Sequence, residues 1–304
     1  MMEPMAVQSS EAVVLRTWPV HEADLVVSFF TRDYGLLKGI AKSALRSRKR
    51  FGGALEPMTM VRAWFAEKPR QDLVRLDQLE IVASPLSAPV GHERLAVLSF
   101  FAELLDESLP ERDPQETVFR LLVAVLEQMN IRQSTALAGE LRPAEPQAIE
   151  PWMPLTYFQL WMTRLMGLLP GLTHCTVCNG ALHAATCGGA DHSPASHATA
   201  CGGADRSARL EAPEEPEINT QAGGVYFHPH HDGLFCNEHR GMGAHQLSTD
   251  SWLLAQRMLR APVAAFAQEL FPRRRAHDLR RFTLQSLERH LERKLRSAEA
   301  LARM

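Results

Sequence analysis

Four residues in the second half of the chain have the types and the spacing of a metal site. Cys175 and Cys178 form a Cys-x-x-Cys pair, and Cys236 and His239 form a Cys-x-x-His pair. Zinc prefers tetrahedral sites of thiolate and imidazole, and a gap of two residues lets one tight turn present both side chains to one ion. Because four protein ligands leave no open position for water, the pattern predicts a structural zinc site and not a catalytic one.

The chain between the two pairs contains a near-duplication. HAATCGGADHSPAS at 183–196 is followed by HATACGGADRSARL at 197–210. The richness in Gly, Ala and Ser predicts that 183–221 is a flexible surface insertion at the tip of the zinc loop. Competing ligands are the duplicated cysteines and histidines that lack a fixed partner: His174, Cys187, Cys201, His228, His230 and His231. A metal-free alternative, with Cys175 and Cys178 as buried thiols, stays open.

A second group of residues could bind phosphate. The net charge is only −2, but the stretch 38–50 has six cations and no acid: Lys38, Lys42, Arg46, Arg48, Lys49 and Arg50. Such a segment can neutralise the phosphates of nucleic acid, and Phe51 beside it could meet a base. The alternative is a solvated charged loop. The later cluster of Arg273–Arg275, Arg280 and Arg281 is either a second phosphate patch or, as we favour, the polar face of a helix.

Catalytic patterns do not occur in the sequence. It has no phosphate-binding P-loop, no dinucleotide fingerprint, no nucleophile elbow and no His-Glu-x-x-His pair. A zinc deaminase would need Pro before its Cys-x-x-Cys pair, and Cys175 follows His174 instead. We therefore expect no enzyme. A zinc-dependent nucleotide or base hydrolase or deaminase that uses 228–231 is the main alternative, and a protein-interaction adaptor for acidic tails is a third.

The elements that must position these residues fall into two classes. Alternating apolar residues predict strands at 11–18, 24–31, 34–42, 58–66 and 71–82. Five short strands indicate a small barrel, either an OB-fold or an SH3-like barrel. Gly35 and Gly39 would relieve crowding around its third strand. We expect Trp18 and Trp64 in the barrel core.

Helical spacing takes over after Pro85. It predicts helices at 91–109, 117–129, 152–169, 248–259 and 261–270, and one long final helix at 273–301. The stretch 152–169 is apolar nearly all round and should be buried. No secretory leader and no long apolar span is visible, and five cysteines clustered in one region suit a metal better than disulfides. A cytoplasmic protein is expected.

The order of these parts, and several stretches of sequence, resemble the RecO family of bacterial recombination mediators. The stretches are EAVVLRTWPVHEADLVVSFFTRDYGLLKGIAKSALRSRKRFGGALEPMTMV at 11–61, LPGLTHCTVC ending at Cys178, and RHLERKLRSAEAL at 289–301. The resemblance implies an α+β multidomain fold. Its parts would be an OB-fold barrel at 1–84, a helical domain at 85–172 and 246–304, and a zinc-finger-like element at 173–245.

The resemblance also implies a function in DNA repair through the RecF pathway. Family members bind single- and double-stranded DNA and anneal strands coated by single-stranded DNA-binding protein. With RecR they help RecA displace that coat, and they turn over no substrate. The stretch 38–50 would be the leading DNA contact. His239 stands where the family usually has a fourth cysteine, and the insertion has no assignable counterpart.

Overall fold

A computed structural model describes residues 7–67, 71–86, 90–135, 150–182 and 224–303. The duplicated insertion, with Cys187 and Cys201, lies outside these residues. The chain divides into two compact units. Unit 1 comprises Met1–Pro170 and Asp250–Met304, and unit 2 comprises Gly171–Thr249. No helix among the described residues combines the length and the apolar character that a membrane span requires.

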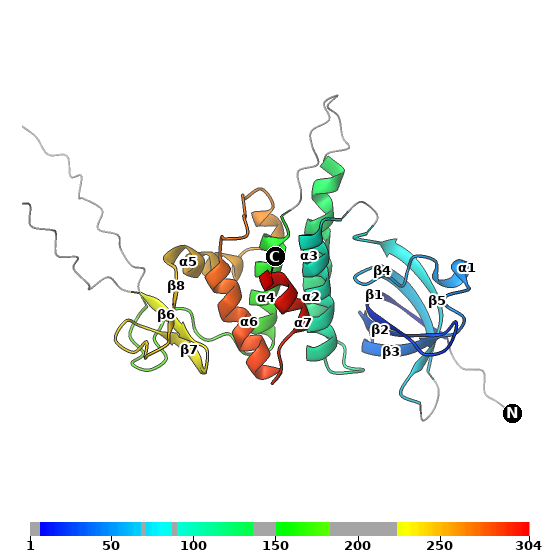
Figure 1. Cartoon of the computed structure of the whole chain (residues 1–304), viewed down its shortest axis with the longest axis horizontal. Helices are drawn as coiled ribbons and strands as arrows, with labels where there is room; N and C mark the ends of the chain where they lie inside the picture. Colours follow the sequence, from blue (N-terminus) through cyan, green and yellow to red (C-terminus); the bar gives the residue numbers. More distant parts are fainter. Residues whose placement is uncertain (1–6, 68–70, 87–89, 136–149, 183–223, 304) are drawn as a thin grey trace, which may run out of the picture. The chain divides into compact units, whose positions relative to one another are not determined.

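The N-terminal part of unit 1 is a closed five-stranded barrel (Figure 1). Its strands are β1 (Val7–Pro19), β2 (Leu25–Thr31), β3 (Gly35–Ala41), β4 (Met60–Ala66) and β5 (Val74–Ala83), with a short helix α1 (Arg48–Phe51) before β4. The strand order is β1-β2-β3-β5-β4, β3 pairs with β5 in parallel, and β1 pairs with both β2 and β4. This connectivity is that of the OB-fold, which decides between the two barrels that the sequence left open.

Two glycines of β3 lie where a side chain would be crowded, as predicted. A Cβ at Gly39 would lie 3.0 Å from the Val74 side chain and 3.1 Å from the Phe29 ring, so the crowded strand leaves little room for one. Gly35 has a φ of +71°, and a Cβ there would meet the backbone of Asp113 at 2.2 Å. Gly35 thus lets the start of β3 approach the chain that follows α2.

Three helices continue unit 1: α2 (His92–Ser108), α3 (Glu116–Thr135) and α4 (Trp152–Leu165). Eleven of the 14 residues of α4 are buried, which confirms the prediction of an apolar central helix. Tyr157 and Phe158 belong to the core, as expected from their stretch. The Tyr157 hydroxyl donates to the Ala261 carbonyl at 3.0 Å, and the Trp161 indole donates to the Met258 carbonyl at 3.1 Å. These bonds join α4 to the C-terminal segment.

The C-terminal segment differs from the prediction. After α5 (Thr249–Met258) and the 3₁₀ helix η1 (Val263–Phe266), the expected single helix at 273–301 is two helices, α6 (His277–His290) and α7 (Arg296–Arg303). The prediction of one helix was wrong because the break is fixed by side chains. The Glu288 carboxylate accepts the N–H of Leu295 at 3.0 Å, and Glu292 adopts a left-handed conformation with a φ of 53°.

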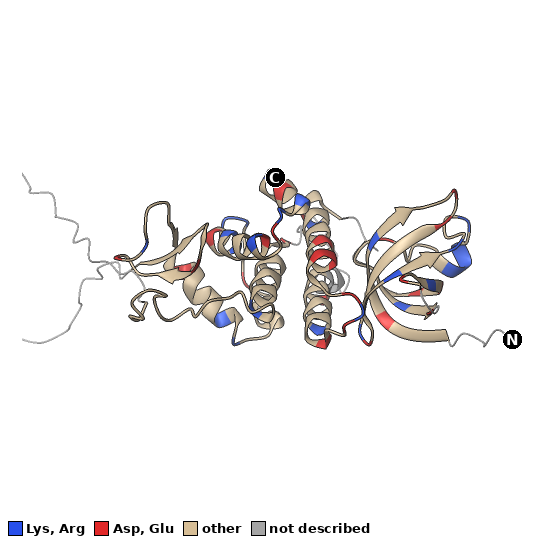
Figure 2. Cartoon of the chain, turned by 90° about the horizontal axis from the view of Figure 1, so that it is seen from below, with Lys and Arg blue, Asp and Glu red and all other residues tan. Residues whose placement is uncertain are grey.

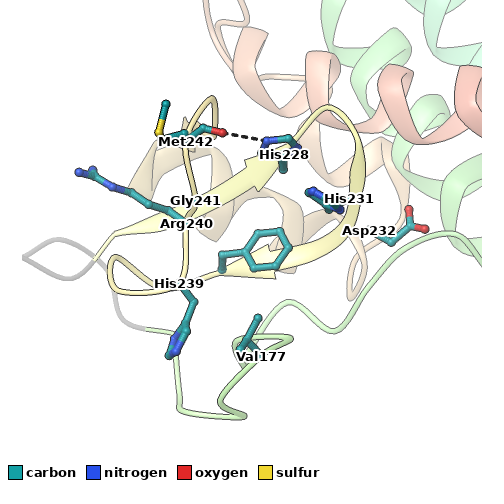
Figure 3. A pocket seen from close by; sticks show the side chains of 9 residues that line it. Val177, His228, His231, Asp232, His239, Arg240, Gly241 and Met242 are labelled. Carbon is teal, nitrogen blue, oxygen red and sulfur yellow. Dashed lines mark hydrogen bonds between the residues drawn. The ribbon is translucent and has the colours of Figure 1, made fainter.

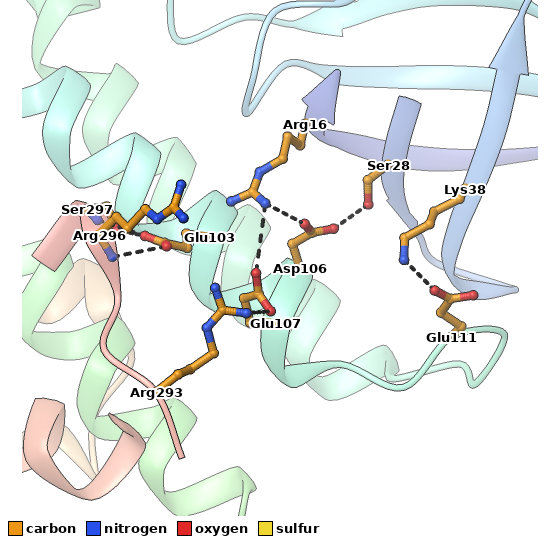
Figure 4. Close-up of polar contacts among 10 residues, drawn as sticks. All are labelled: Arg16, Ser28, Lys38, Glu103, Asp106, Glu107, Glu111, Arg293, Arg296 and Ser297. Atoms are coloured by element: carbon orange, nitrogen blue, oxygen red, sulfur yellow. Dashed lines mark hydrogen bonds and ion pairs between the residues drawn. The ribbon is translucent and has the colours of Figure 1, made fainter. Parts of the chain in front are cut away.

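The start of α7 is held by a carboxylate from α2. Glu103 is buried and accepts the backbone N–H groups of Arg296 and Ser297 at 3.1 and 2.8 Å, as well as the Ser297 hydroxyl (Figure 4). Burial alone would raise the pKa of Glu103, but the hydrogen bonds from Ser297 and Arg296 outweigh it and lower the pKa. The charged carboxylate therefore acts as an N-cap supplied by another helix.

Unit 2 is built on a small antiparallel sheet of order β7-β6-β8. Its strands are β6 (Val225–His228), β7 (His231–Phe235) and β8 (His245–Leu247). The inward-facing side chains Val225, Phe227, Leu234 and Leu247 are almost fully buried. The second Cys/His pair begins directly after the end of β7.

Candidate nucleic-acid surface and metal centre

The six cations predicted to bind DNA belong to three consecutive segments and not to one loop. Lys38 belongs to β3, Lys42 and Arg46 to the turn after it, and Arg48, Lys49 and Arg50 to α1. Figure 2 shows the basic residues gathered over α1 at the end of the barrel. We name the segment from Lys42 to Arg50 the basic loop.

Lys38 is separated from the others by its partner. Its ammonium donates to the Glu111 carboxylate at 2.6 Å (Figure 4), and this hydrogen bond is the main reason why the pKa of Lys38 is raised. Arg16 on β1 lies 3.3 Å from Asp106, and Ser28 on β2 donates to Asp106 at 2.6 Å. Carboxylates in and just after α2 therefore face strands β1–β3.

This acidic stripe, consisting of Glu103, Asp106, Glu107 and Glu111, was not anticipated from the sequence. The available signal was the spacing of Glu103, Asp106 and Glu107 by three and four residues, which puts these three on one side of a helix; Glu111 follows the helix and had no such signal. Glu107 also pairs with Arg293 at 2.5 Å. The stripe thus connects the barrel, α2 and the segment before α7 within unit 1 (Figure 4).

Arg50 and Phe51 shape the basic loop from within. The Arg50 guanidinium donates to the Lys42 carbonyl at 2.7 Å and to the Ser47 hydroxyl at 3.0 Å, and it lies 5.0 Å from the centre of the Phe51 ring. Phe51 is 1% exposed and belongs to the barrel core. The expectation that Phe51 could meet a base was wrong, because its ring is buried in the barrel core beneath the loop.

The remaining cations of the loop face solvent. Arg46 has only a long contact of 3.5 Å with Glu22, and both side chains are mostly exposed, so this pair contributes little. Lys42, Arg48 and Lys49 are exposed and have no carboxylate partner among the described residues. Such cations can neutralise phosphates without first giving up an ion pair.

The two tryptophans of the barrel are half-buried and do not belong to the barrel core, contrary to expectation. Trp64 lies on β4 between Val61, Ala63 and Phe65, which point inward, so alternation places its ring on the outer face. Trp18 lies 5.7 Å from the Arg16 guanidinium. Neither ring lies on the basic loop.

The second cationic cluster separates into different roles. Arg273–Arg275 precede α6, and Arg280 is buried within it. The Arg280 guanidinium donates to the Thr156 hydroxyl at 2.9 Å and to the carbonyls of Arg275 and Arg273, and burial lowers its pKa to about 10. Arg280 is therefore an internal support for the turn that starts α6. It belongs neither to a phosphate patch nor to a solvated helix face.

The four predicted metal ligands come together in unit 2. The ligand atoms of Cys175, Cys178, Cys236 and His239 all lie within 4.8 Å of one another, and Cys236 Sγ is 3.2 Å from His239 Nδ1. A tetrahedral ion with ordinary metal–sulfur and metal–nitrogen bonds separates its ligand atoms by about 3.5–3.8 Å. The group could thus hold a metal ion with small adjustments, and the cysteines form no disulfide.

Two tight turns present these ligands. The first is a hairpin in which Cys175 N–H donates to the Gly180 carbonyl at 2.8 Å and Leu182 N–H donates to Thr173 at 2.8 Å. Asn179 turns the chain with a φ of 55°. In the second turn, His239 N–H donates to the Cys236 carbonyl at 3.1 Å. In both turns two residues separate the two ligands, as is typical of zinc-binding turns.

Thr176 fixes the first turn to the sheet. Its backbone N–H donates to the Leu234 carbonyl at 2.9 Å, and its hydroxyl accepts the Leu234 N–H at 3.2 Å. Gly233 makes this approach possible, because a Cβ there would stand 2.1 Å from the Thr176 hydroxyl oxygen and its φ is +116°. These contacts between Thr176 and Leu234 therefore fix the position of the Cys175/Cys178 pair relative to the Cys236/His239 pair.

Electrostatics around the thiols favour one thiolate. Burial opposes ionisation of Cys175, but backbone N–H groups of Cys178, Cys236 and Val177 together lower its pKa to about 6. At Cys178 the N–H of Gly180 lowers the pKa, but the neighbouring thiols of Cys175 and Cys236 raise it overall. Three thiols this close compete for ionisation unless a cation joins them.

His228, the first histidine of the 228–231 run, already uses both of its ring nitrogens. His228 Nδ1 accepts the N–H of His230 at 3.1 Å, and Nε2 lies 3.0 Å from the Met242 carbonyl (Figure 3). A carbonyl can only accept, so Nε2 carries the proton and neither nitrogen offers a lone pair to a metal. His231 and Asp232 line the same shallow hollow. Within the described residues, the Cys₃His set is the one group of three or more ligands able to hold a metal.

Comparisons with known proteins agree with this architecture. The family model "Recombination protein O N terminal" matches residues 5–85, and "Recombination protein O C terminal" matches residues 92–222. The chain belongs to the RecO family. A DNA repair protein RecO of Koribacter versatilis is 42% identical over 95% of both chains. The RecO of Anaeromyxobacter sp. strain K is 36% identical over 55% of this chain and 59% of its own length. The hydrolase or deaminase alternative has no support among these relatives.

Proposed function

We propose that this RecO chain is a DNA-binding recombination mediator in DNA repair. It binds single- and double-stranded DNA, anneals complementary strands and, with RecR, assists RecA on DNA coated by single-stranded DNA-binding protein. The observation that carries the proposal is the 42% sequence identity to a DNA repair protein RecO over 95% of the chain. An OB-fold barrel with a loop of exposed cations suits such a task.

Binding would depend on phosphate neutralisation by the basic loop. Lys42, Arg46, Arg48 and Lys49 point charge outward, while Arg50 holds the loop in shape. Lys38 would add to this surface only when its pair with Glu111 opens. Contacts to phosphate carry little sequence information, so we expect weak sequence preference and a strong dependence on salt.

Annealing would follow from the same charges. Two strands repel one another through their phosphates, and a protein that neutralises both lowers the repulsion while they search for register. No bond is made or broken in this process, so the activity needs no catalytic residue. We accordingly infer a non-enzymatic protein that acts on DNA in the cytoplasm, at the nucleoid.

For the metal centre we propose structural zinc bound by Cys175, Cys178, Cys236 and His239. Three thiolates and an imidazole are a donor set that zinc prefers, and the four ligands close the coordination sphere. The division of labour follows: 1–84 would bind DNA, the helical parts at 85–172 and 246–304 would support it, and 173–245 would be a zinc element carrying the insertion at 183–221.

An annealing assay tests the proposed function. Complementary oligonucleotides, one of them coated with single-stranded DNA-binding protein, are mixed with the full chain at several salt concentrations. We expect faster annealing than without the chain, with loss of the effect at high salt. Annealing at the uncatalysed rate under all conditions would refute the proposal. Addition of RecR and RecA then tests the mediator step.

A further inference from the structure

Leu45 is an apolar side chain exposed in the middle of the basic loop. It is 61% exposed, whereas its neighbour Ala44 and the ring of Phe51 are buried in the barrel core. Ala44 and Phe51 therefore anchor the loop in the barrel core, while Leu45 faces outward. A large exposed apolar residue is ordinary when it stands alone, so its meaning depends on how it is held and what surrounds it.

The backbone around Leu45 is fixed on both sides. Leu45 N–H donates to the Ala23 carbonyl at 3.2 Å, and Ser43 N–H donates to the Asp24 carboxylate at 2.7 Å. On the far side, Arg50 reaches back to the Lys42 carbonyl at 2.7 Å. A loop that is already ordered spends little free energy on ordering when a ligand arrives.

Cations flank the exposed side chain. Lys42 and Arg46 lie three residues before it and directly after it, and Arg48 follows at the start of α1. The loop that bonds to Leu45 through Ala23 exposes a second apolar side chain, Val20. An exposed apolar side chain surrounded by cations suits a ligand with an anionic backbone and flat apolar groups between the charges. Unstacked nucleotides have this chemistry, while a duplex hides its base faces in the stack.

We propose that Leu45 contacts a base of single-stranded DNA, packing on its exposed face while the neighbouring cations hold the phosphates. The contact takes the place of an aromatic stacking residue, since Phe51 is buried and Trp18 and Trp64 lie off the loop. It gives the loop a preference for unpaired strands that charge alone does not provide. This inference rests on the proposed DNA binding by the same loop.

The test compares Leu45→Ser with Leu270→Ser, a matched control at an even more exposed leucine (78%) in the C-terminal segment. Affinities are measured for an oligothymidylate, an abasic strand of the same length and a duplex, across a range of salt. Loss of one apolar contact should weaken oligothymidylate binding by about three- to tenfold. Binding of the abasic strand and the salt slope should not change, and Leu45→Trp should bind oligothymidylate more tightly.

Equal oligothymidylate affinity of Leu45→Ser and the wild type would overturn the inference, as would equal weakening for the abasic strand. If Leu45 instead contacted an acidic peptide, the first of these results would be seen. Circular dichroism and the melting temperature verify that the variants fold. If charge variants of the loop weaken binding but Leu45→Ser does not, only this inference fails. If no variant of the loop matters, the proposed function of the loop fails.

Discussion

Removal of the metal should unfold unit 2 and leave unit 1 folded. The described residues of unit 2, 171–182 and 224–249, contain three short strands and few buried apolar side chains. A small apolar core of this kind gives limited stability, and a disulfide, a metal or a partner commonly supplements it. The three described cysteines form no disulfide, and the proposed zinc would supply this stabilisation.

The expected magnitude is large. A structural zinc ion contributes about 10–16 kcal/mol to the folding of a small domain, whereas full burial of one Phe or Leu side chain contributes about 1.5–3 kcal/mol. Cys175 is the most buried of the three thiols. Loss of a supporting residue outside the ligand set typically costs about 10–100-fold in metal affinity, so Cys175→Ser should cost more than about 100-fold.

Zinc content and hydrogen exchange of the full chain measure this effect. Chelation should release stoichiometric zinc and accelerate amide exchange around Phe227 and Leu234, with unchanged protection in the barrel. The double variant Cys187→Ser, Cys201→Ser is the matched control and should retain zinc. Unchanged exchange in unit 2 after zinc has been removed would show that the metal does not stabilise this unit. Zinc loss in the double variant would contradict the ligand assignment.

Two further predictions concern the carboxylates of the acidic stripe. Glu103→Gln should lower the free energy of unfolding of unit 1 by about 1–2 kcal/mol, because a charged acceptor of several hydrogen bonds becomes neutral. Since the folded pKa of Glu103 lies below its ordinary value of 4.5, its stabilisation is present above pH 4.5 and is lost as the pH falls through the folded pKa. The free energy of unfolding is measured with urea at pH 7 and at lower pH. The wild type and the exposed control Glu127→Gln should show this loss of stability in acid, and Glu103→Gln should not. The same loss in all three proteins would contradict the capping role. Glu111→Gln should change stability by less than about 1 kcal/mol, because its pair with Lys38 is largely exposed. The same substitution should strengthen DNA binding and steepen its salt slope, and an unchanged slope would show that Lys38 makes no phosphate contact.

The five strands were predictable because alternation is a local property of the sequence. The bounds of β2 and β3 agree with the predicted ones to within one residue, whereas β1 begins four residues before its predicted start, β4 two residues after it and β5 three residues after it. The choice between barrels was not predictable from strands alone. It depends on the parallel pairing of β3 with β5, which joins residues far apart in the chain.

The metal ligands were also accessible from the sequence, since each pair is a local turn. The sorting of side chains in the basic loop was not. Leu45 and Phe51 are both large and apolar, and only the three-dimensional barrel decides that Phe51 fills the core. Similarly, the partner of Lys38 lies 73 residues away, and a carboxylate on α2 determines where α7 begins. Long-range contacts of this kind leave no periodic signal.

DNA binding by the basic loop through phosphate neutralisation can be tested directly. The direct perturbation is the triple substitution of Lys42, Arg48 and Lys49 by Ala, which removes three exposed cations and spares Arg50, whose hydrogen bonds hold the loop together. Each phosphate contact to single-stranded DNA contributes about 0.7 to the slope of log K against log salt. Three contacts therefore correspond to a slope change of about 2.

The matched control replaces Arg120, Arg260 and Lys294 by Ala, three exposed cations of the helical parts, so that both variants lose the same net charge. Affinity for single-stranded DNA is measured over a range of salt concentrations for both variants and the wild type. We expect a slope smaller by about 2 for the basic-loop variant and a slope near that of the wild type for the control. Equal slopes for the two variants would contradict this expectation.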